Sequence, residues 1–262
     1  MDKSFASYVA IIVATGTEEN AVKKMYEWMS VKFDCDDQTY YVASFVKNGV
    51  ANKIVYARQS EMGMTVAVTL TMKLIEHFRP QYVLMAGIAA GIAAGIAPAG
   101  SAEQIYGDVV VADMIWNYAS GKFVSPDRTE IRFGNVGFIP RPSVVKTDEK
   151  ILSYVKQAAS SAENQCRVHF GIMATGSAVV TNREIVNKQI HSMFSETIGL
   201  DMEAYGVVYA AQNATAPRPI PLVIKSVCDY ANNEKSDQYQ KFAAYTSCEF
   251  SKLVIEKFLP TE

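Results

Sequence analysis

The chain has 262 residues, 49% of them hydrophobic and 20% charged, with a formal net charge of −2. Acids and bases are interspersed, which excludes the positive field that nucleic acids and anionic membranes require and favours a small, weakly charged ligand. The cysteines are widely spaced without a CxxC pair, so we expect reduced thiols in the cytoplasm, with no disulfide framework or zinc knuckle. They are Cys35, Cys166, Cys228 and Cys248.

Buried β-branched runs alternate with helical patterns along the chain. Tyr8 to Ala14 predicts a strand buried on both faces. Glu18 to about Ser30 carries apolar residues at helical spacing and predicts a helix. Asn48-Gly49 lies between strand-like runs at 39–46 and 50–57, which predicts a hairpin.

Further strands and helices alternate in the same way after this hairpin. We expect strands at 82–88, 107–112, 168–174 and 221–227, and helices at 63–78, 145–161, 182–193, 203–212 and about 236–258. Residues 116–142 have no long periodicity and are predicted as an aromatic, proline-containing connection. The alternation predicts a single three-layer α/β/α domain over residues 1–262, and the hairpin makes its central sheet mixed.

An almost wholly apolar segment, 82–100, raises the question of a membrane span. It contains GxxxG spacing, but it is mostly Ala and Gly, and Pro98 with Gly100 interrupts it. Residues 86–97 are three copies of Ala-Gly-Ile-Ala, too short a repeat for a solenoid. We expect a buried strand that runs into a glycine-rich loop, and no membrane span.

Four acids stand directly after predicted buried strands: Glu18, Asp201, Glu203 and Asp229. Parallel strands bring such positions to one edge of a sheet, where small ligands bind in open α/β folds. Carboxylates gathered there repel each other and lose solvent, which raises the pKa of at least one and separates acid from base. Cleavage of a glycosidic bond requires that division of labour.

Other chemistries find less support in the residues. The histidines (His77, His169 and His191) lack ligand spacing, so we expect no metal. No Gly-x-Ser-x-Gly elbow is present, and Cys228 has no identifiable histidine partner, which disfavours nucleophilic catalysis. The glycine-rich loop matches neither a dinucleotide nor a Walker motif, so we expect no cofactor.

Seven blocks in order resemble the nucleoside phosphorylase superfamily, specifically its 5'-methylthioadenosine/S-adenosylhomocysteine nucleosidase branch. They cover nearly the whole chain. The blocks are Ile11–Ala14 with Glu18, Met62–Met64, Ala86–Gly91, Gly107–Ala112, Ala174–Gly176, Leu200–Ala204 and Val227–Ala231. The closing stretch, from Asp229 through Lys235 to Tyr245, also resembles nucleosidase-like domains fused to signalling and defence proteins.

The resemblance implies a role for several residues. Glu18 matches the carboxylate that activates water at the anomeric carbon, and Asp229 matches the acid that protonates purine N7. Glu203 matches the acceptor of the ribose hydroxyls, and Met202 packs under the sugar. Four further residues are implied as contacts of the base and the nucleoside: Val179, Val180, Ile88 and Ala89.

The chain also departs from the family pattern. Cys228 stands where the family commonly has serine, and Asp201 replaces a usual glutamate. Val179 stands where a phenylalanine often stacks on adenine. The resemblance therefore implies lower base affinity or a broader base preference.

The choice between water and phosphate as nucleophile rests on where cations lie. Phosphorylases of this superfamily hold phosphate with an arginine before the glycine-rich loop and a Gly-Asp-Pro-x-Arg loop after the first strand. Here Met85 stands at the first place and Thr15-Gly-Thr-Glu18 at the second. A carboxylate repels phosphate, so hydrolysis is favoured, while Arg58 leaves phosphorolysis as an alternative.

The sequence thus predicts a purine nucleoside N-ribohydrolase that acts on adenosine-type nucleosides and assembles as a homodimer. Alternatives are a phosphorylase, a catalytically inactive nucleoside-binding module, and an AMP or ATP nucleosidase. The last would use cations near the 5' end, for which the candidates are Arg128, Arg132 and Arg141. Aromatic residues are candidates either for a 5' pocket or for core and subunit contacts: Trp116, Tyr118, Phe133, Phe138 and Pro140.

Overall fold

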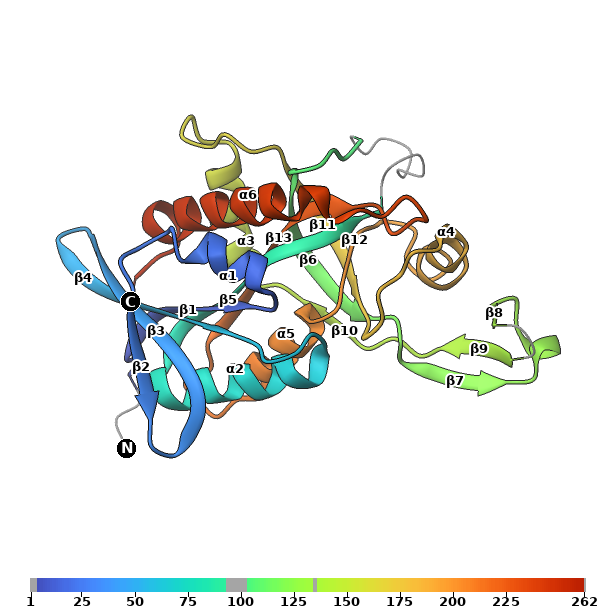
Figure 1. The fold of residues 1–262 in the computed structure, drawn as a ribbon, viewed down its shortest axis with the longest axis horizontal. Helices are drawn as coiled ribbons and strands as arrows, with labels where there is room; N and C mark the ends of the chain where they lie inside the picture. Colours follow the sequence, from blue (N-terminus) through green and yellow to red (C-terminus); the bar gives the residue numbers. More distant parts are fainter. Residues whose placement is uncertain (1–3, 93–102, 134–135, 262) are drawn as a thin grey trace.

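A ten-stranded mixed sheet forms the centre of the computed structural model, which describes residues 4–92, 103–133 and 136–261 (Figure 1). Its strands are β1 (Ser7–Val13), β2 (Met29–Phe33), β3 (Asp36–Lys47), β4 (Val50–Arg58), β5 (Pro80–Gly91), β6 (Val109–Asn117), β10 (Val144–Lys146), β11 (Val168–Thr175), β12 (Thr197–Asp201) and β13 (Ile220–Asp229). They lie in the order β10-β6-β11-β12-β5-β1-β4-β3-β2, with β13 paired to both β5 and β6. Parallel pairs, such as β1 with β5, and antiparallel pairs, such as β3 with β4, make the sheet mixed, as expected.

Helices cover both faces of this sheet (Figure 1). The α-helices are α1 (Gly16–Val22), α2 (Met64–Phe78), α3 (Glu149–Ala159), α4 (Arg183–Ile185), α5 (Ala204–Asn213) and α6 (Gln240–Leu253). Short 3₁₀ turns occur at Pro126–Arg128 and Asp237–Tyr239, and π-helical segments at Val186–His191 and Val254–Phe258. Helices α2 and α5 lie on one face and α1, α3 and α6 on the other, which gives the three-layer α/β/α architecture predicted.

Strand β1 shows how the sequence builds two cores around one sheet. All of its residues are buried, and successive side chains point to opposite faces. Val9 and Ile11 pack in the cluster that includes α1, α3 and α6, whereas Ala10 and Ile12 pack in the cluster beneath α2 and α5. A continuous β-branched run is therefore buried on both sides, as parallel strands require.

The helix predicted from Glu18 to about Ser30 is wrong in its second half. Helix α1 ends at Val22, and Met29–Phe33 forms strand β2 beside β3. Trp28 packs edge-on against Tyr56, with ring centroids 4.7 Å apart, and its indole N–H donates to the Val22 carbonyl. Aromatic packing, instead of a helical stripe, partly buries Trp28.

The connection predicted at 116–142 also contains more structure than expected. After β6, it forms a three-stranded antiparallel sheet of β7 (Gly121–Val124), β9 (Val136–Pro140) and β8 (Arg132–Phe133). This small sheet projects from the body of the protein (Figure 1). The helix expected at 145–161 begins only at Glu149, because β10 comes first and the Asp148 carboxylate caps the helix by accepting from the Ile151 N–H.

Three other features of the sequence are the predicted hairpin, the Ala-Gly-Ile-Ala repeat and the question of a membrane span. Asn48 and Gly49 adopt positive φ angles of 52° and 77° in the β3–β4 turn, which confirms the hairpin. The first Ala-Gly-Ile-Ala copy lies in β5, whereas the third, residues 94–97, lies outside the described residues. In the described part of the chain, no helix has the length and apolar character needed to cross a membrane.

Candidate active site

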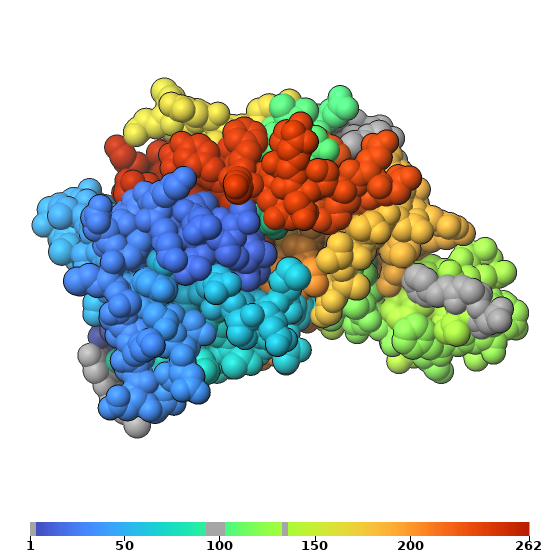
Figure 2. All heavy atoms as spheres, viewed as in Figure 1, coloured from blue at the N-terminus to red at the C-terminus, as the bar shows by residue number. Residues whose placement is uncertain are grey.

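A cavity opens where α1, α6, the start of α2 and the segment after β11 meet, and Figure 2 shows the recess at the surface. The cavity has a volume of about 140 Å³. Its lining residues are Ala14, Thr15, Glu18, Met62, Ile88, Ala89, Ala90, Ala178, Val179, Val180, Leu200, Asp201, Met202, Glu203, Cys228, Asp229, Lys235 and Gln240. All eight residues proposed from the sequence as catalytic or substrate-binding are in this set.

Glu18 is held rigidly at the wall of the cavity. Thr15 and Glu18 form a capping box at the start of α1. One carboxylate oxygen, Oε2, accepts from the Ala14 and Thr15 N–H groups at 2.7 and 2.8 Å, and Oε1 accepts from the Ile88 N–H at 2.8 Å. A side chain at Gly87 would collide with this carboxylate, since its Cβ would lie 1.8 Å from Oε1. The Gly-Ile pair of β5 thus makes both the room and the donor for Glu18.

Asp201 is the last residue of β12, and Glu203 directly precedes α5. The Glu203 carboxylate accepts from the Gly63 N–H at 2.9 Å, which ties this acid to the start of α2. Asp201 instead supports the turn: Thr175 Oγ1 donates to it at 2.7 Å, and the Ala204 N–H donates at 2.9 Å. Both residues are nearly buried, so their carboxylates lie in a region of low polarity.

A buried lysine, Lys225 of β13, lies beneath these acids and was not predicted from the sequence. Its Nζ lies 3.6 Å from Glu18 Oε1 and 3.8 Å from Asp201 Oδ2, within ion-pair range but beyond hydrogen-bond distance. Lys225 is the single cation inside the apolar run 221–227. This position could have indicated charged partners, because a lysine is almost never fully buried unless it is paired.

Burial and the neighbouring charges shift the pKa values of Glu203, Asp201 and Lys225. Burial raises the pKa of Glu203 to about 7; repulsion from Asp201 and Glu18 adds to this effect, and Lys225 opposes it. Burial also raises the pKa of Asp201, against the opposing attraction of Lys225. Burial disfavours the charged form of Lys225, but the three carboxylates outweigh it and raise the pKa of its ammonium group. The cluster therefore retains the lysine cation and one readily protonated carboxyl group at neutral pH.

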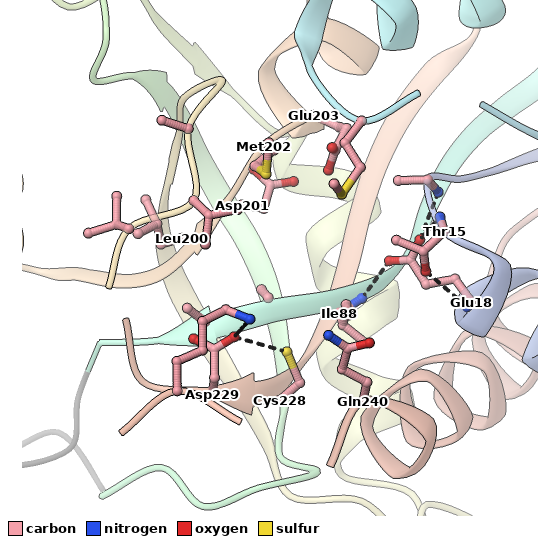
Figure 3. Close-up of a pocket in the computed structure, with 18 residues that line it drawn as sticks. Thr15, Glu18, Ile88, Leu200, Asp201, Met202, Glu203, Cys228, Asp229 and Gln240 are labelled. Atoms are coloured by element: carbon pink, nitrogen blue, oxygen red, sulfur yellow. Dashed lines mark hydrogen bonds and ion pairs between the residues drawn. The ribbon is translucent and has the colours of Figure 1, made fainter. Parts of the chain in front are cut away.

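Asp229, at the end of β13, lies at the opposite end of the cavity (Figure 3). Its Oδ1 accepts from the Ala231 N–H at 3.0 Å. On the other oxygen, Oδ2, the Cys228 thiol donates at 3.4 Å, and the Lys235 Nζ lies 3.6 Å away. Burial and the adjacent carboxylate raise the pKa of Cys228, so its sulfur stays a protonated thiol.

The remaining predicted contacts fill the space between the two ends. Figure 3 shows Ile88 and Met202 between the Glu18–Glu203 end and the Asp229 end. Ala89 and Val180 are buried, whereas the Val179 side chain is 54% exposed. The walls are thus largely apolar, with the polar groups concentrated at the two ends.

Residues proposed for the alternatives lie elsewhere. Arg58 pairs with Glu19 at 3.1 Å outside the cavity lining, and Met85 is buried in the core. The three arginines suggested for a nucleotide 5' end do not line the cavity, and neither do Trp116, Tyr118, Phe138 and Pro140. Of the latter, Trp116 and Tyr118 pack in a separate apolar cluster.

The histidines contact neighbouring groups in separate places. His169 Nε2 lies 2.7 Å from Asp108, His77 lies 3.3 Å from Asp36, and His191 lies 3.3 Å from the Thr197 carbonyl. In the described ranges, no group of three or more His, Cys, Asp or Glu side chains is placed to hold a metal ion.

A profile described as Phosphorylase superfamily matches residues 8–260, almost the whole chain. The chain belongs to the phosphorylase superfamily.

Three relatives illustrate which proteins the chain resembles. It is 28% identical to an uncharacterized protein, y4jS, of Sinorhizobium fredii, over 89% of this chain and 56% of that protein. It is 25% identical to a 5'-methylthioadenosine/S-adenosylhomocysteine nucleosidase of Bacillus velezensis, over 75% and 77% of the two chains. It is also 22% identical to the ATP nucleosidase Cap17 of Escherichia coli, over 90% and 48%. The chain thus spans about half the length of the first and third of these relatives.

Solved structures agree on the superfamily fold. The 5'-methylthioadenosine/S-adenosylhomocysteine nucleosidase of Neisseria meningitidis, in complex with methylthio-immucillin-A, aligns with a TM-score of 0.75 at 22% identity, over 96% of this chain and 100% of that one. The enzyme from Streptococcus pyogenes, in complex with 5-methylthiotubericidin, also gives 0.75 at 21% identity, over 98% of each chain. The superfamily fold predicted from the sequence is therefore confirmed.

Proposed function

We propose that this protein is a purine nucleoside N-ribohydrolase that releases the base from adenosine-type nucleosides such as methylthioadenosine. The observation that carries the proposal is the placement of three acids, Glu18, Glu203 and Asp229, from separate elements around one cavity with apolar walls. Glycosidic cleavage uses this kind of arrangement, with one carboxylate for water and another acid for the leaving group.

The proposed reaction begins at the buried end of the cavity. Glu203 accepts hydrogen bonds from the ribose hydroxyls, and Met202 packs against the sugar. Glu18 takes a proton from a water molecule that attacks the anomeric carbon on the face opposite the base. As the C1'–N9 bond breaks, its electron pair moves to the purine, and Asp229 delivers a proton to N7. General acid and base steps of this kind contribute typically about 10²–10⁴-fold each.

Charge favours water over phosphate as the nucleophile. A phosphate dianion needs guanidinium groups or several N–H donors, and next to Glu18 it would meet a carboxylate. The backbone donors at this place, the N–H groups of Ala14, Thr15 and Ile88, are already taken by Glu18. Arg58, the remaining candidate from the sequence, is paired with Glu19 outside the cavity.

The decisive experiment is incubation of the pure protein with methylthioadenosine in phosphate-free buffer containing ¹⁸O-water. The expected products are free adenine and a sugar that carries ¹⁸O at its anomeric hydroxyl. Release of adenine only after phosphate is added, with a sugar 1-phosphate as the second product, would assign a phosphorylase instead. Tight nucleoside binding by calorimetry without any turnover would assign a binding module.

The substrate range is best established with one panel: methylthioadenosine, adenosine, inosine, AMP and ATP. The nucleotides belong in this panel because one relative is named an ATP nucleosidase. We expect the uncharged nucleosides to be cleaved faster, because the three arginines suggested for a 5' phosphate lie outside the cavity lining.

We also propose a homodimer, because the resembling nucleosidase branch often completes its 5' pocket with a neighbouring subunit. Sedimentation velocity is the direct test. One chain has a mass of 28.8 kDa, so a homodimer should give twice that mass in this measurement.

A further inference from the structure

Lys235 occupies an unusual position for a surface-loop lysine. It follows β13 by six residues, yet it lines the cavity and its side chain is only 23% exposed. Its Nζ lies 3.6 Å from Asp229 Oδ2 and 3.2 Å from Asp237 Oδ1. Asp237 is largely exposed, so the lysine joins the buried acid of the cavity to the solvent-facing side of the loop.

The other partners of Asp229 explain why a cation matters here. The Ala231 N–H holds one carboxylate oxygen. The second oxygen accepts from the Cys228 thiol at 3.4 Å, and a thiol is a weak donor. In the part of the chain that the structure describes, the Lys235 ammonium is the cation paired with this oxygen.

We propose that Lys235 is a positioning residue for Asp229, whose carboxyl group it orients and whose negative charge it balances once the proton has passed to the purine. This inference rests on the proposed function, because it assumes that Asp229 protonates the leaving group. When the C1'–N9 bond breaks, the purine takes the electron pair and becomes a stronger base. N7 then takes the proton of the Asp229 carboxyl group, which becomes a carboxylate, and the Lys235 ammonium group 3.6 Å from Oδ2 stabilises that negative charge.

Lys235 keeps its charge throughout the turnover. Burial disfavours the charged form of Lys235, but Asp229 and Asp237 outweigh burial and raise the pKa of its ammonium group. The Asp229 carboxylate regains its proton from water after the purine has left, which closes the proton balance.

The competing explanation is structural: Lys235 could serve only to tether the loop between β13 and α6. A double-mutant cycle separates the two, because residues that act through one another show non-additive effects. We would measure kcat for Lys235→Met, Asp229→Asn and the double variant on the nucleoside that the wild type cleaves fastest. Thermal unfolding of each variant would be recorded alongside, to detect loss of folding.

The expected result is strong non-additivity. Lys235→Met should lower kcat by about 10–100-fold and Asp229→Asn by at least about 100-fold, as expected for leaving-group acid catalysis. The double variant should match Asp229→Asn alone, because the lysine has no acid left to serve. Lys235→Arg, which keeps the charge and the reach, should restore most of the rate.

Two matched variants sharpen the test. Asp237→Asn removes the solvent-side partner of Lys235 and should leave kcat within about twofold of the wild type. Cys228→Ser supplies a stronger donor to Asp229 and should recover part of the rate lost in Lys235→Met.

Several outcomes would overturn the inference while leaving the proposed function standing. They are multiplicative losses in the double variant, an unchanged kcat in Lys235→Met, or a Lys235→Arg variant as slow as Lys235→Met. Wild-type protein that cleaves none of the panel would instead contradict the proposed function itself.

Discussion

The two ends of the cavity are built differently. At the Glu18–Glu203 end, the carboxylates are buried, fixed by main-chain N–H groups, and underlain by Lys225, whose side chain is 1% exposed. At the Asp229 end, the ion pair with Lys235 is partly exposed, since the lysine side chain is 23% exposed. In the proposed reaction, the buried end acts on the sugar, and the open end supplies the proton for the leaving base through a few contacts.

The charge balance of the two ends differs in the same way. Three acids share one ammonium group at the buried end, so the proton affinity of each acid depends on the charge of the others, and the charge of the cluster depends on pH. One acid pairs with one ammonium group at the open end, and solvent reaches that ammonium group. Substitutions at the buried end should therefore have larger effects than substitutions at the open end.

The largest expected effect is on the proposed water-activating residue at the buried end. Glu18→Gln keeps the side-chain shape but removes the proton acceptor, and we expect kcat to fall by about 10²–10⁴-fold. Adenine release followed by liquid chromatography measures it. Glu19→Gln is the matched control, because Glu19 lies in the same helical turn, pairs with Lys23 and Arg58, and does not line the cavity. Equal losses in both variants would contradict a catalytic role for Glu18.

Removal of the buried cation tests whether the buried end is held together by charge. Lys225→Met leaves Glu18, Asp201 and Glu203 without their ammonium partner, and breaking a buried ion pair costs about 3–5 kcal/mol. We expect the free energy of unfolding, from urea denaturation at pH 7, to fall by that amount, and the loss to shrink at pH 5.5 as carboxylates take up protons. Lys241→Met, at an exposed site on α6, should change it by less than about 0.5 kcal/mol.

These contrasts also explain what could be predicted from the sequence. The central strands were predicted well because buried β-branched runs such as Tyr8 to Val13 have few alternatives, whereas β2 and the short strands β7 to β10 were missed. The acids at strand ends followed from the parallel sheet. Lys225 was missed because a single cation in an apolar strand gives no indication of which carboxylates surround it. The contact of Lys235 was equally hidden, since it depends on how a loop folds back toward β13.

The helix error has a related cause. Met25 and Trp28 lie at helical spacing from Val22, and the periodicity alone extended the helix through them. In the structure, Trp28 packs on Tyr56 from the neighbouring hairpin, and β2 begins at Met29. Tertiary aromatic contacts, which a local pattern does not contain, decided the outcome.

A pH profile of the rate tests whether Glu203, at the buried end, takes up a proton near neutral pH. The pKa of Glu203 is raised to about 7, by burial and by repulsion from Asp201 and Glu18. Below this pH the group is protonated and loses an acceptor for the ribose hydroxyls, so kcat/KM should fall about tenfold per pH unit as pH decreases from 7. Steady-state rates from pH 5 to 8 measure it. A level kcat/KM between pH 5.5 and 7 would mean that Glu203 does not titrate there in the free protein.

The smallest expected effect is at the exposed part of the cavity lining, where Val179 leaves the expected base position without an aromatic face. Val179→Phe should stabilise the bound nucleoside by about 0.5–1.5 kcal/mol through stacking, and so lower KM about 2–10-fold with little change in kcat. The exposed site has room for the ring, so the fold should not resist it. Val136→Phe, on the small sheet and outside the cavity, should leave KM unchanged. An unchanged KM in Val179→Phe would mean that the base does not lie against this residue.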